Sequence, residues 1–215
     1  DAGNTNAHFA LFRGKRIVRR WVTSTAAFSN SIRCDFDKFC YCSVVPQVNS
    51  KLERIAKARG VEPLQFGRDV MPLVKNATRT PWTTGPDRLA NATYAYVNFG
   101  GPAVVVDVGT ALTIDVVDAR GNFIGGAIGP GATLIIDAMN SGTARLPKAP
   151  LKRPHSLVGR DTVEAMQVAT FGMLDSFIVS NVRAIKRMFR TKCAVIGTGG
   201  AIKLFKCLGI FDELN

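Results

Sequence analysis

The chain has 215 residues, of which 47% are hydrophobic, and its 28 Lys and Arg against 16 Asp and Glu give a formal net charge of +12. This length and apolar content suffice for a substantial core in one large or two small domains. No apolar run reaches the roughly 18 residues that span a bilayer, so we expect no membrane partner. The sequence shows no signal-peptide pattern, although its abrupt start leaves a lost leader open. The basic residues are scattered and lack interleaved aromatic residues, which favours attraction of anions over a dedicated nucleic-acid site.

Hydrophobic periodicity and turn residues predict strands alternating with helices, which indicates an α/β fold. The predicted strands are 7–12, 17–23, 39–45, 103–107, 111–117, 123–128 and 194–196; the predicted helices are 47–59, 85–99, 131–141, 162–188 and 201–208. Glycine and proline break the chain at residues 98–102. We therefore expect one domain over 1–100 and a second over 101–215.

Two turns combine an acidic residue, a glycine and a threonine. We call them the first acidic turn (residues 1–5, Asp-Ala-Gly-Asn-Thr) and the second acidic turn (residues 107–110, Asp-Val-Gly-Thr). Backbone N–H groups of such a turn can face phosphate oxygens, glycine admits close approach, and the carboxylate can hold a cation. One such turn is weak evidence, because these residues favour turns in general. Two copies predict related half-molecules that bind one nucleotide between them.

The start of the chain and its cysteines give two smaller expectations. Asp1 stands where a first strand should already have ended, so we expect apolar residues before it. The five cysteines lack zinc-type spacing and are expected to be buried thiols in a reducing cytoplasm, with a metal or redox role as the alternative. The two histidines, His8 and His155, are expected at the surface.

Eight motifs occur in an order that resembles the type III pantothenate kinase family. They are DAGNT (1–5), SVVP (43–46), GPDRLANA (85–92), VVDVGTALTIDVV (105–117), FIGGAIGPG (123–131), ARLP (144–147), GRDTVEAMQ (159–167) and GTGGA (197–201). Each motif alone is modest, but their joint order is specific and covers nearly the whole chain. The resemblance implies two ribonuclease-H-like domains of the sugar kinase, Hsp70 and actin superfamily, with the nucleotide in the cleft between them. It also implies ATP-dependent phosphorylation of pantothenate to 4'-phosphopantothenate, the first step of coenzyme A biosynthesis.

The resemblance assigns the substrate site to two motifs. Asp87 is implied as the base that accepts a proton from the pantothenate hydroxyl, and Gly85 and Arg88 as substrate-binding neighbours. The alternative is that Asp87 only caps a helix. Thr162 is implied to reach the pantothenate of a partner chain in a homodimer, the alternative being that it belongs to a capping box with Glu164.

The resemblance also places the nucleotide and its ions. Asp1 is implied to hold Mg²⁺ with ATP, and Asp107 a monovalent cation, K⁺ or NH₄⁺. The implied nucleotide-binding residues are Asp1, Gly3, Asn4, Thr5, Gly109, Thr110, Gly199 and Gly200. The alternative is that these segments are ordinary chain reversals whose N–H groups are satisfied by nearby side chains.

Two departures from the family pattern leave a second function open. Thr78 stands where the family has a tyrosine, and Ala201 where it has an acidic residue. The alternative is therefore a non-catalytic or regulatory relative of the same fold, associated with nucleic acid through its charge. Retention of Asp87 and both acidic turns favours the enzyme, because a regulator needs no base beside a phosphate site.

Overall fold

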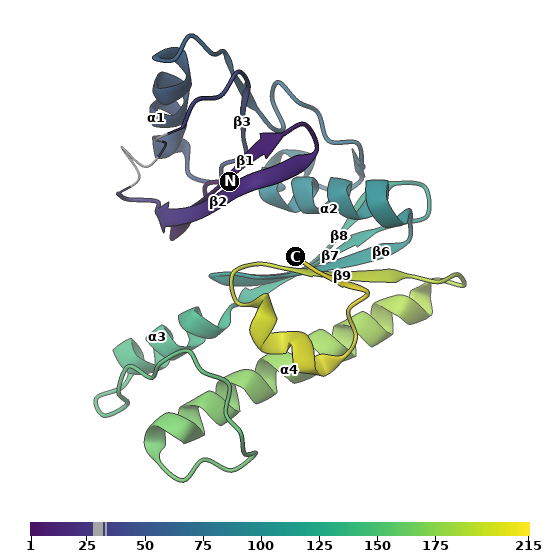
Figure 1. Cartoon of the computed structure of the whole chain (residues 1–215). Helices are drawn as coiled ribbons and strands as arrows, with labels where there is room; N and C mark the ends of the chain where they lie inside the picture. Colours follow the sequence, from purple (N-terminus) through teal and green to yellow (C-terminus); the bar gives the residue numbers. More distant parts are fainter. Residues whose placement is uncertain (28–31, 33) are drawn as a thin grey trace. The chain divides into compact units, whose positions relative to one another are not determined.

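The computed structural model describes residues 1–27, 32 and 34–215, and the chain is drawn in Figure 1. It divides into two compact units. Unit 1 comprises Asp1–Leu73 and Arg79–Thr93, and unit 2 comprises Val74–Thr78 and Tyr94–Asn215. All of the predicted helices and strands lie within the described residues.

The first segment of unit 1, up to Leu73, contains two short sheets and a helix among its described residues. β1 (Asn6–Arg13) and β2 (Arg16–Ser24) form an antiparallel hairpin, and β3 (Phe39–Tyr41) pairs in parallel with β4 (Pro63–Gln65). α1 (Pro46–Lys57) starts at a proline and buries Val48, Leu52 and Ala56, a spacing of four residues that keeps them on one face. Val48 and Leu52 pack with Tyr41 in a small core.

The strand predicted at 39–45 is shorter than expected. β3 ends at Tyr41, and the hydroxyl oxygen of Ser43 accepts a hydrogen bond from the Val45 N–H (3.1 Å). This local bond turns the backbone out of the strand just before Pro46 begins α1. The prediction was therefore wrong over the last residues of that range.

Unit 2 is built on a six-stranded sheet with the order β10-β9-β6-β7-β8-β5. The strands are β5 (Lys75–Asn76), β6 (Ala103–Val108), β7 (Ala111–Val117), β8 (Asn122–Pro130), β9 (Ala194–Thr198) and β10 (Glu213–Leu214). β6, β7 and β8 are antiparallel neighbours, whereas β9 is parallel to β6. The β-branched runs of β6 and β7 suit these central strands because both of their faces are buried.

The helices of the chain are α1, α2 (Pro86–Phe99), α3 (Ala132–Gly142) and α4 (Thr162–Met188), with the short 3₁₀ helices η2 (Pro81–Thr83) and η3 (Ile202–Leu208) among the described residues. The α-helix predicted at 201–208 is thus corrected to a 3₁₀ helix. Its buried side chains, Ile202 and Phe205, are three residues apart, and a 3₁₀ helix of three residues per turn places them on one face.

Two helices cover opposite faces of the unit 2 sheet. α4 runs along one face (Figure 1), where its Phe171, Leu174 and Ile178 pack with Val104 and Val106 of β6. Alternate residues of a strand face opposite ways, and Ala95 of α2 accordingly packs with Val105 on the other face.

Arg153 ties the loop before α4 to both α4 and η3. Its guanidinium donates to both carboxylate oxygens of Asp175 (2.8 and 2.6 Å) and, through Nε, to the Leu204 carbonyl oxygen (2.5 Å). It also lies over the rings of Phe171 and Phe205, at 4.8 and 5.3 Å from their centroids. A planar fork with stacking faces is specific to arginine.

Within the described residues, α4 is the one helix long and apolar enough to cross a membrane, with a mean hydropathy of 1.2 over its best window. The sequence-based statement that no such segment exists was therefore too strong. The finding is weak evidence for a span, because a core helix passes the same test, and α4 contributes Phe171, Leu174, Ile178 and Val182 to the core of unit 2.

The cysteines are all free thiols but are not all buried. Cys193 is buried as expected, Cys34 and Cys42 are half-buried, and Cys40 and Cys207 are exposed. The expectation of buried thiols is thus wrong for Cys40 and Cys207. His8 and His155 are exposed, as predicted.

Candidate functional site

Three loops of unit 2 meet at the end of β6. The second acidic turn follows β6, and its Gly109 N–H donates to the Ala111 carbonyl oxygen (3.0 Å). The Gly131 N–H, at the start of α3, donates to the Thr110 carbonyl oxygen (2.9 Å), and the Ala201 N–H donates to the Val108 carbonyl oxygen (3.0 Å). The N-terminus of α3 therefore lies against the turn, and a helix N-terminus favours anions such as phosphate.

Gly199 packs directly on Asp107. Its φ is +97°, and a Cβ there would lie 2.4 Å from Oδ1 of Asp107 and 2.6 Å from the Val108 backbone. Only glycine can occupy this position without displacing its neighbours. Gly200, by contrast, is exposed, and a Cβ on it would contact nothing within 4 Å. The structure thus brings Gly199 and the Ala201 N–H to the second acidic turn, whereas Gly200 points into open space.

The first acidic turn is part of a short extended segment in unit 1. The Asp1 ammonium donates to the His8 carbonyl oxygen (2.9 Å), and the His8 N–H donates to that of Asp1 (2.8 Å). On its other side, the Ala2 N–H donates to the Cys42 carbonyl oxygen (2.8 Å). Asn4 and Thr5 are exposed at the tip of the turn.

Asp87 lies in the first turn of α2, which begins at Pro86. Its Oδ1 accepts a hydrogen bond from the Arg88 N–H (2.9 Å), and a Cβ on Gly85 would lie 2.4 Å from that oxygen. Gly85 therefore leaves the space that the carboxylate occupies. Asp87, Gly85 and Arg88 are all half-buried.

The segment that carries Asp87 also lies near the first acidic turn, because a Cβ on Gly85 would lie 3.8 Å from Cγ1 of Val44, and the Val44 N–H donates to the Ala2 carbonyl oxygen (3.1 Å). Burial raises the pKa of the Cys42 thiol to about 11, and the negative charge of Asp87 acts in the same direction. Cys42 is bonded to Ala2, so unit 1 places a carboxylate close to the segment that carries the turn.

Comparison with known proteins identifies the family. The family model described as type III pantothenate kinase matches residues 1–184. A type III pantothenate kinase of Paramagnetospirillum magneticum is 35% identical over 223 residues, which cover 95% of this chain and 86% of the relative. That of Caulobacter vibrioides is also 35% identical and covers 100% of this chain and 89% of the relative. This chain belongs to the type III pantothenate kinase family.

Two solved structures share the fold of this chain. A structure described as a Baf family transcriptional activator from Campylobacter jejuni aligns with a TM-score of 0.60 at 19% identity, covering 100% of this chain and 88% of the other. An activator of 2-hydroxyisocaproyl-CoA dehydratase from Clostridium difficile, with bound ADPNP, aligns with a TM-score of 0.50 at 12% identity, over 99% and 85% of the two chains. At these identities the likeness is one of fold.

In this family member, Thr162 is not the residue that caps α4. The Asp161 carboxylate accepts a hydrogen bond from the Glu164 N–H (2.8 Å), and the Glu164 carboxylate accepts one from the Arg160 N–H (2.8 Å). Thr162 is exposed, and its hydroxyl has no partner in the described part of the chain. Substitutions at Asp161 and at Thr162 can therefore test the helix cap and the proposed substrate contact separately.

The structure brings in two residues that sequence reasoning left out of the site. Gly131 ends the FIGGAIGPG motif, but the motif did not predict its contact with the second acidic turn. A Cβ on Gly131 would lie 2.2 Å from the Gly109 carbonyl oxygen. Thr25 follows β2 and gave no motif signal, yet it is bonded to the first acidic turn.

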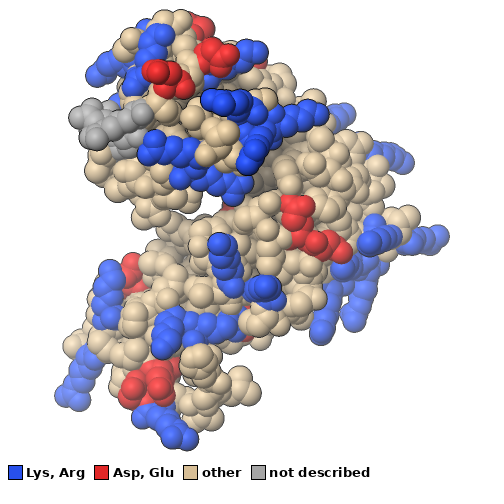
Figure 2. Space-filling model, in the orientation of Figure 1, with Lys and Arg blue, Asp and Glu red and all other residues tan. Residues whose placement is uncertain are grey.

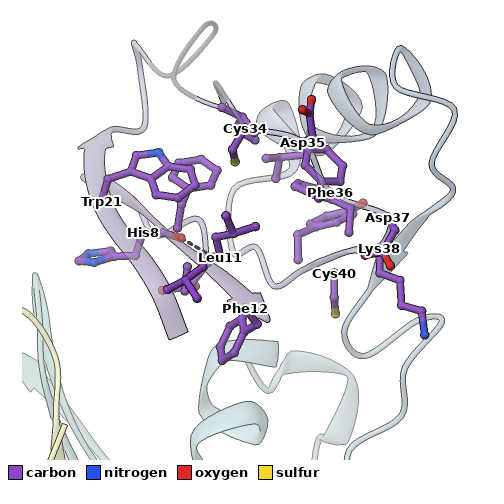
Figure 3. Close-up of a pocket in the computed structure, with 18 of the residues that line it drawn as sticks. His8, Leu11, Phe12, Trp21, Cys34, Asp35, Phe36, Asp37, Lys38 and Cys40 are labelled. Atoms are coloured by element: carbon purple, nitrogen blue, oxygen red, sulfur yellow. Dashed lines mark hydrogen bonds between the residues drawn. The ribbon is translucent and has the colours of Figure 1, made fainter. Parts of the chain in front are cut away.

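A cavity of about 760 Å³ lies elsewhere in unit 1 (Figure 3). It is lined by β1, by residues 34–41 and by Leu52 of α1, and Trp21, Phe36 and Cys40 are among the side chains drawn around it. Asp1 is the one predicted site residue in its lining, so the cavity is not the predicted substrate site.

The metal sites implied by the family rest on single carboxylates. No group of three or more His, Cys, Asp or Glu residues in the described ranges is arranged to hold a metal ion. Mg²⁺ in phosphate-transfer sites is commonly held by one or two carboxylates, with phosphate oxygens and water as its other ligands. A lone exposed Asp1 fits that donor set.

Lys and Arg side chains are spread over both units on the face shown in Figure 2, as the scattered sequence positions predicted.

Proposed function

We propose that this chain phosphorylates pantothenate to 4'-phosphopantothenate with ATP, the first step of coenzyme A biosynthesis. Membership of the family supports this proposal. The observation that carries it is the Asp87 carboxylate, held in the first turn of α2 and close to the segment bearing the first acidic turn. A regulatory relative would need no carboxylate there.

In the proposed reaction Asp87 accepts the proton of the pantothenate hydroxyl. The hydroxyl oxygen forms a bond to the γ-phosphorus while the bond from that phosphorus to the bridging oxygen of ADP breaks. The Arg88 N–H fixes Oδ1 of Asp87 (2.9 Å), which orients the carboxylate before substrate arrives. The Arg88 guanidinium is proposed to bind the substrate's anionic group.

The two acidic turns are proposed to bind the ATP phosphates, one turn from each unit. Asp1 is the proposed ligand for Mg²⁺, and Asp107 for K⁺ or NH₄⁺; these cations offset the repulsion between the carboxylates and the phosphates. The packing of Gly199 on Asp107 supports the proposal that residues 197–201 bind the adenosine side.

We further propose a homodimer in the cytoplasm. Five free thiols support a reducing compartment. For the dimer, α4 exposes Ala169, Met173 and Ser180 on the face that its own sheet does not cover, and Met173 is 53% exposed. Met166 and Thr170 of the same helix are buried within unit 2 and do not belong to that face.

A coupled assay of ADP release tests the proposal. With ATP, Mg²⁺ and K⁺ present, ADP release should depend on added pantothenate. Replacing K⁺ by tetramethylammonium at constant ionic strength should suppress turnover, because that cation is too large to sit between Asp107 and phosphate. An equal rate of ADP release with and without pantothenate would contradict the substrate assignment. Equal rates of pantothenate-dependent ADP release in the K⁺ and tetramethylammonium salts would contradict the cation site.

A further inference from the structure

Thr25 holds the first acidic turn at two points. It is 5% exposed and follows directly after β2. Its hydroxyl donates to the Gly3 carbonyl oxygen (2.7 Å), and its backbone N–H donates to the Thr5 carbonyl oxygen (3.0 Å). One buried residue therefore fixes both the middle and the end of this turn.

These bonds set the direction of the turn's amides. In a planar trans peptide the C=O of one residue and the N–H of the next point in opposite directions. With the Gly3 oxygen bonded to Thr25, the Asn4 N–H is directed away from Thr25. Asn4 is exposed and makes no hydrogen bond within the residues described, whereas the Gly3 N–H is already bonded to the Asn6 carbonyl oxygen (3.0 Å).

We infer that Thr25 is a positioning residue for the nucleotide: its hydroxyl holds the Gly3–Asn4 peptide so that the Asn4 N–H faces a phosphate oxygen. This inference rests on the proposed function, because it takes the first acidic turn as a phosphate site. Without the hydroxyl, the half-buried Gly3 carbonyl oxygen loses its partner, and the peptide can rotate to find another.

Isosteric variants separate this role from packing. Thr25→Val replaces the hydroxyl by a methyl group of similar size, and Thr25→Ser keeps the hydroxyl. Thr23→Val is the matched control. It removes a hydroxyl from β2, two residues before Thr25, and the Thr23 hydroxyl has no hydrogen-bond partner among the described residues. Each protein is titrated with the Mg²⁺ complex of a non-hydrolysable ATP analogue by calorimetry, and KM is measured for ATP and for pantothenate.

Thr25→Val should weaken binding of the analogue and raise KM for ATP by roughly tenfold, the effect of about one hydrogen bond. KM for pantothenate should change less than twofold, and Thr25→Ser and Thr23→Val should resemble the parent. Thr25→Ala provides a second variant without the hydroxyl, in case Thr25→Val does not fold.

The inference is overturned if either folded hydroxyl-free variant binds the analogue as tightly as the parent. It is also overturned if Thr25→Ser binds as weakly as Thr25→Val, or if neither hydroxyl-free variant folds, since the hydroxyl would then serve folding. Calorimetry keeps the two proposals distinguishable: a parent that binds the analogue but does not phosphorylate pantothenate refutes the proposed function alone.

Discussion

At the scale of single residues, the Asp87 carboxylate has a structural contact beside its proposed chemical role. It accepts a hydrogen bond from the Arg88 N–H in the first turn of α2. That bond uses Oδ1, and a carboxylate has further lone pairs with which to accept a proton. The two interpretations are therefore compatible.

Asp87→Asn should keep the bond to the Arg88 N–H but lose proton acceptance. We expect turnover to fall by roughly 10²–10⁴-fold, with the affinity for the ATP analogue changed less than twofold. Steady-state kinetics and calorimetry check this. Asp137→Asn is the control, because Asp137 forms an exposed ion pair with Lys148 (3.2 Å). An Asp87→Asn protein with parental turnover would remove Asp87 as the base.

Gly199 is predicted to tolerate no side chain. Gly199→Ala would place a methyl group against Asp107 and the Val108 backbone at a positive φ, so we expect a lower melting temperature and weaker nucleotide binding. Gly200→Ala has open space around it and should melt close to the parent. Thermal denaturation of the pair checks the contrast. Equal melting temperatures would show that residues 197–201 do not pack on Asp107 as described.

The sequence identified the residues of the acidic turns because aspartate, glycine and threonine at close spacing have a recognisable chemistry. It could not identify Thr25, which is about twenty residues away along the chain and contacts the turn only through the pairing of β1 and β2. The same holds for the contact of Gly199 with Asp107. Such contacts depend on which strands become neighbours.

At the scale of elements, α4 shows how a cap and a candidate substrate contact can lie side by side. Asp161→Ala removes the cap and should lower the free energy of unfolding by about 1 kcal/mol. Thr162→Ala removes a hydroxyl without a partner and should leave stability within about 0.5 kcal/mol of the parent while raising KM for pantothenate. Urea denaturation and kinetics of the two variants check this. A loss of stability in Thr162→Ala without any change in KM would reverse the assignment.

Long periodic elements were predicted well and short ones were not. The predicted ranges of α4 and β7 agree with the structure at both ends. β5 and β10 have two residues each and were missed, because so short a strand has no periodicity of its own. They exist because β8 and β9 offer edges to pair with. Residues 201–208 were predicted as an α-helix because their apolar residues mark one face of a helix. That pattern does not distinguish an α-helix from a 3₁₀ helix over so short a segment.

At the scale of the whole molecule, the proposed homodimer predicts shared active sites. If Thr162 of one protomer serves the Asp87 site of its partner, a heterodimer of Asp87→Asn and Thr162→Ala chains contains one intact site and one doubly damaged site. At a pantothenate concentration too low for the Thr162→Ala chain to turn over alone, mixing the two variants should then restore part of the activity. Sedimentation of the mixture checks that heterodimers form. Heterodimers without restored activity, or a parent that sediments as a monomer, would contradict the shared site.

One helix belongs to both units. Residues 86–93 of α2 are grouped with unit 1 and residues 94–99 with unit 2, where Ala95 packs with Val105 of the sheet. Asp87 is eight residues from that anchor, about 12 Å along the axis at 1.5 Å per residue. The helix is continuous from Pro86 to Phe99, so a single element carries both the proposed base and a residue anchored in the sheet of unit 2.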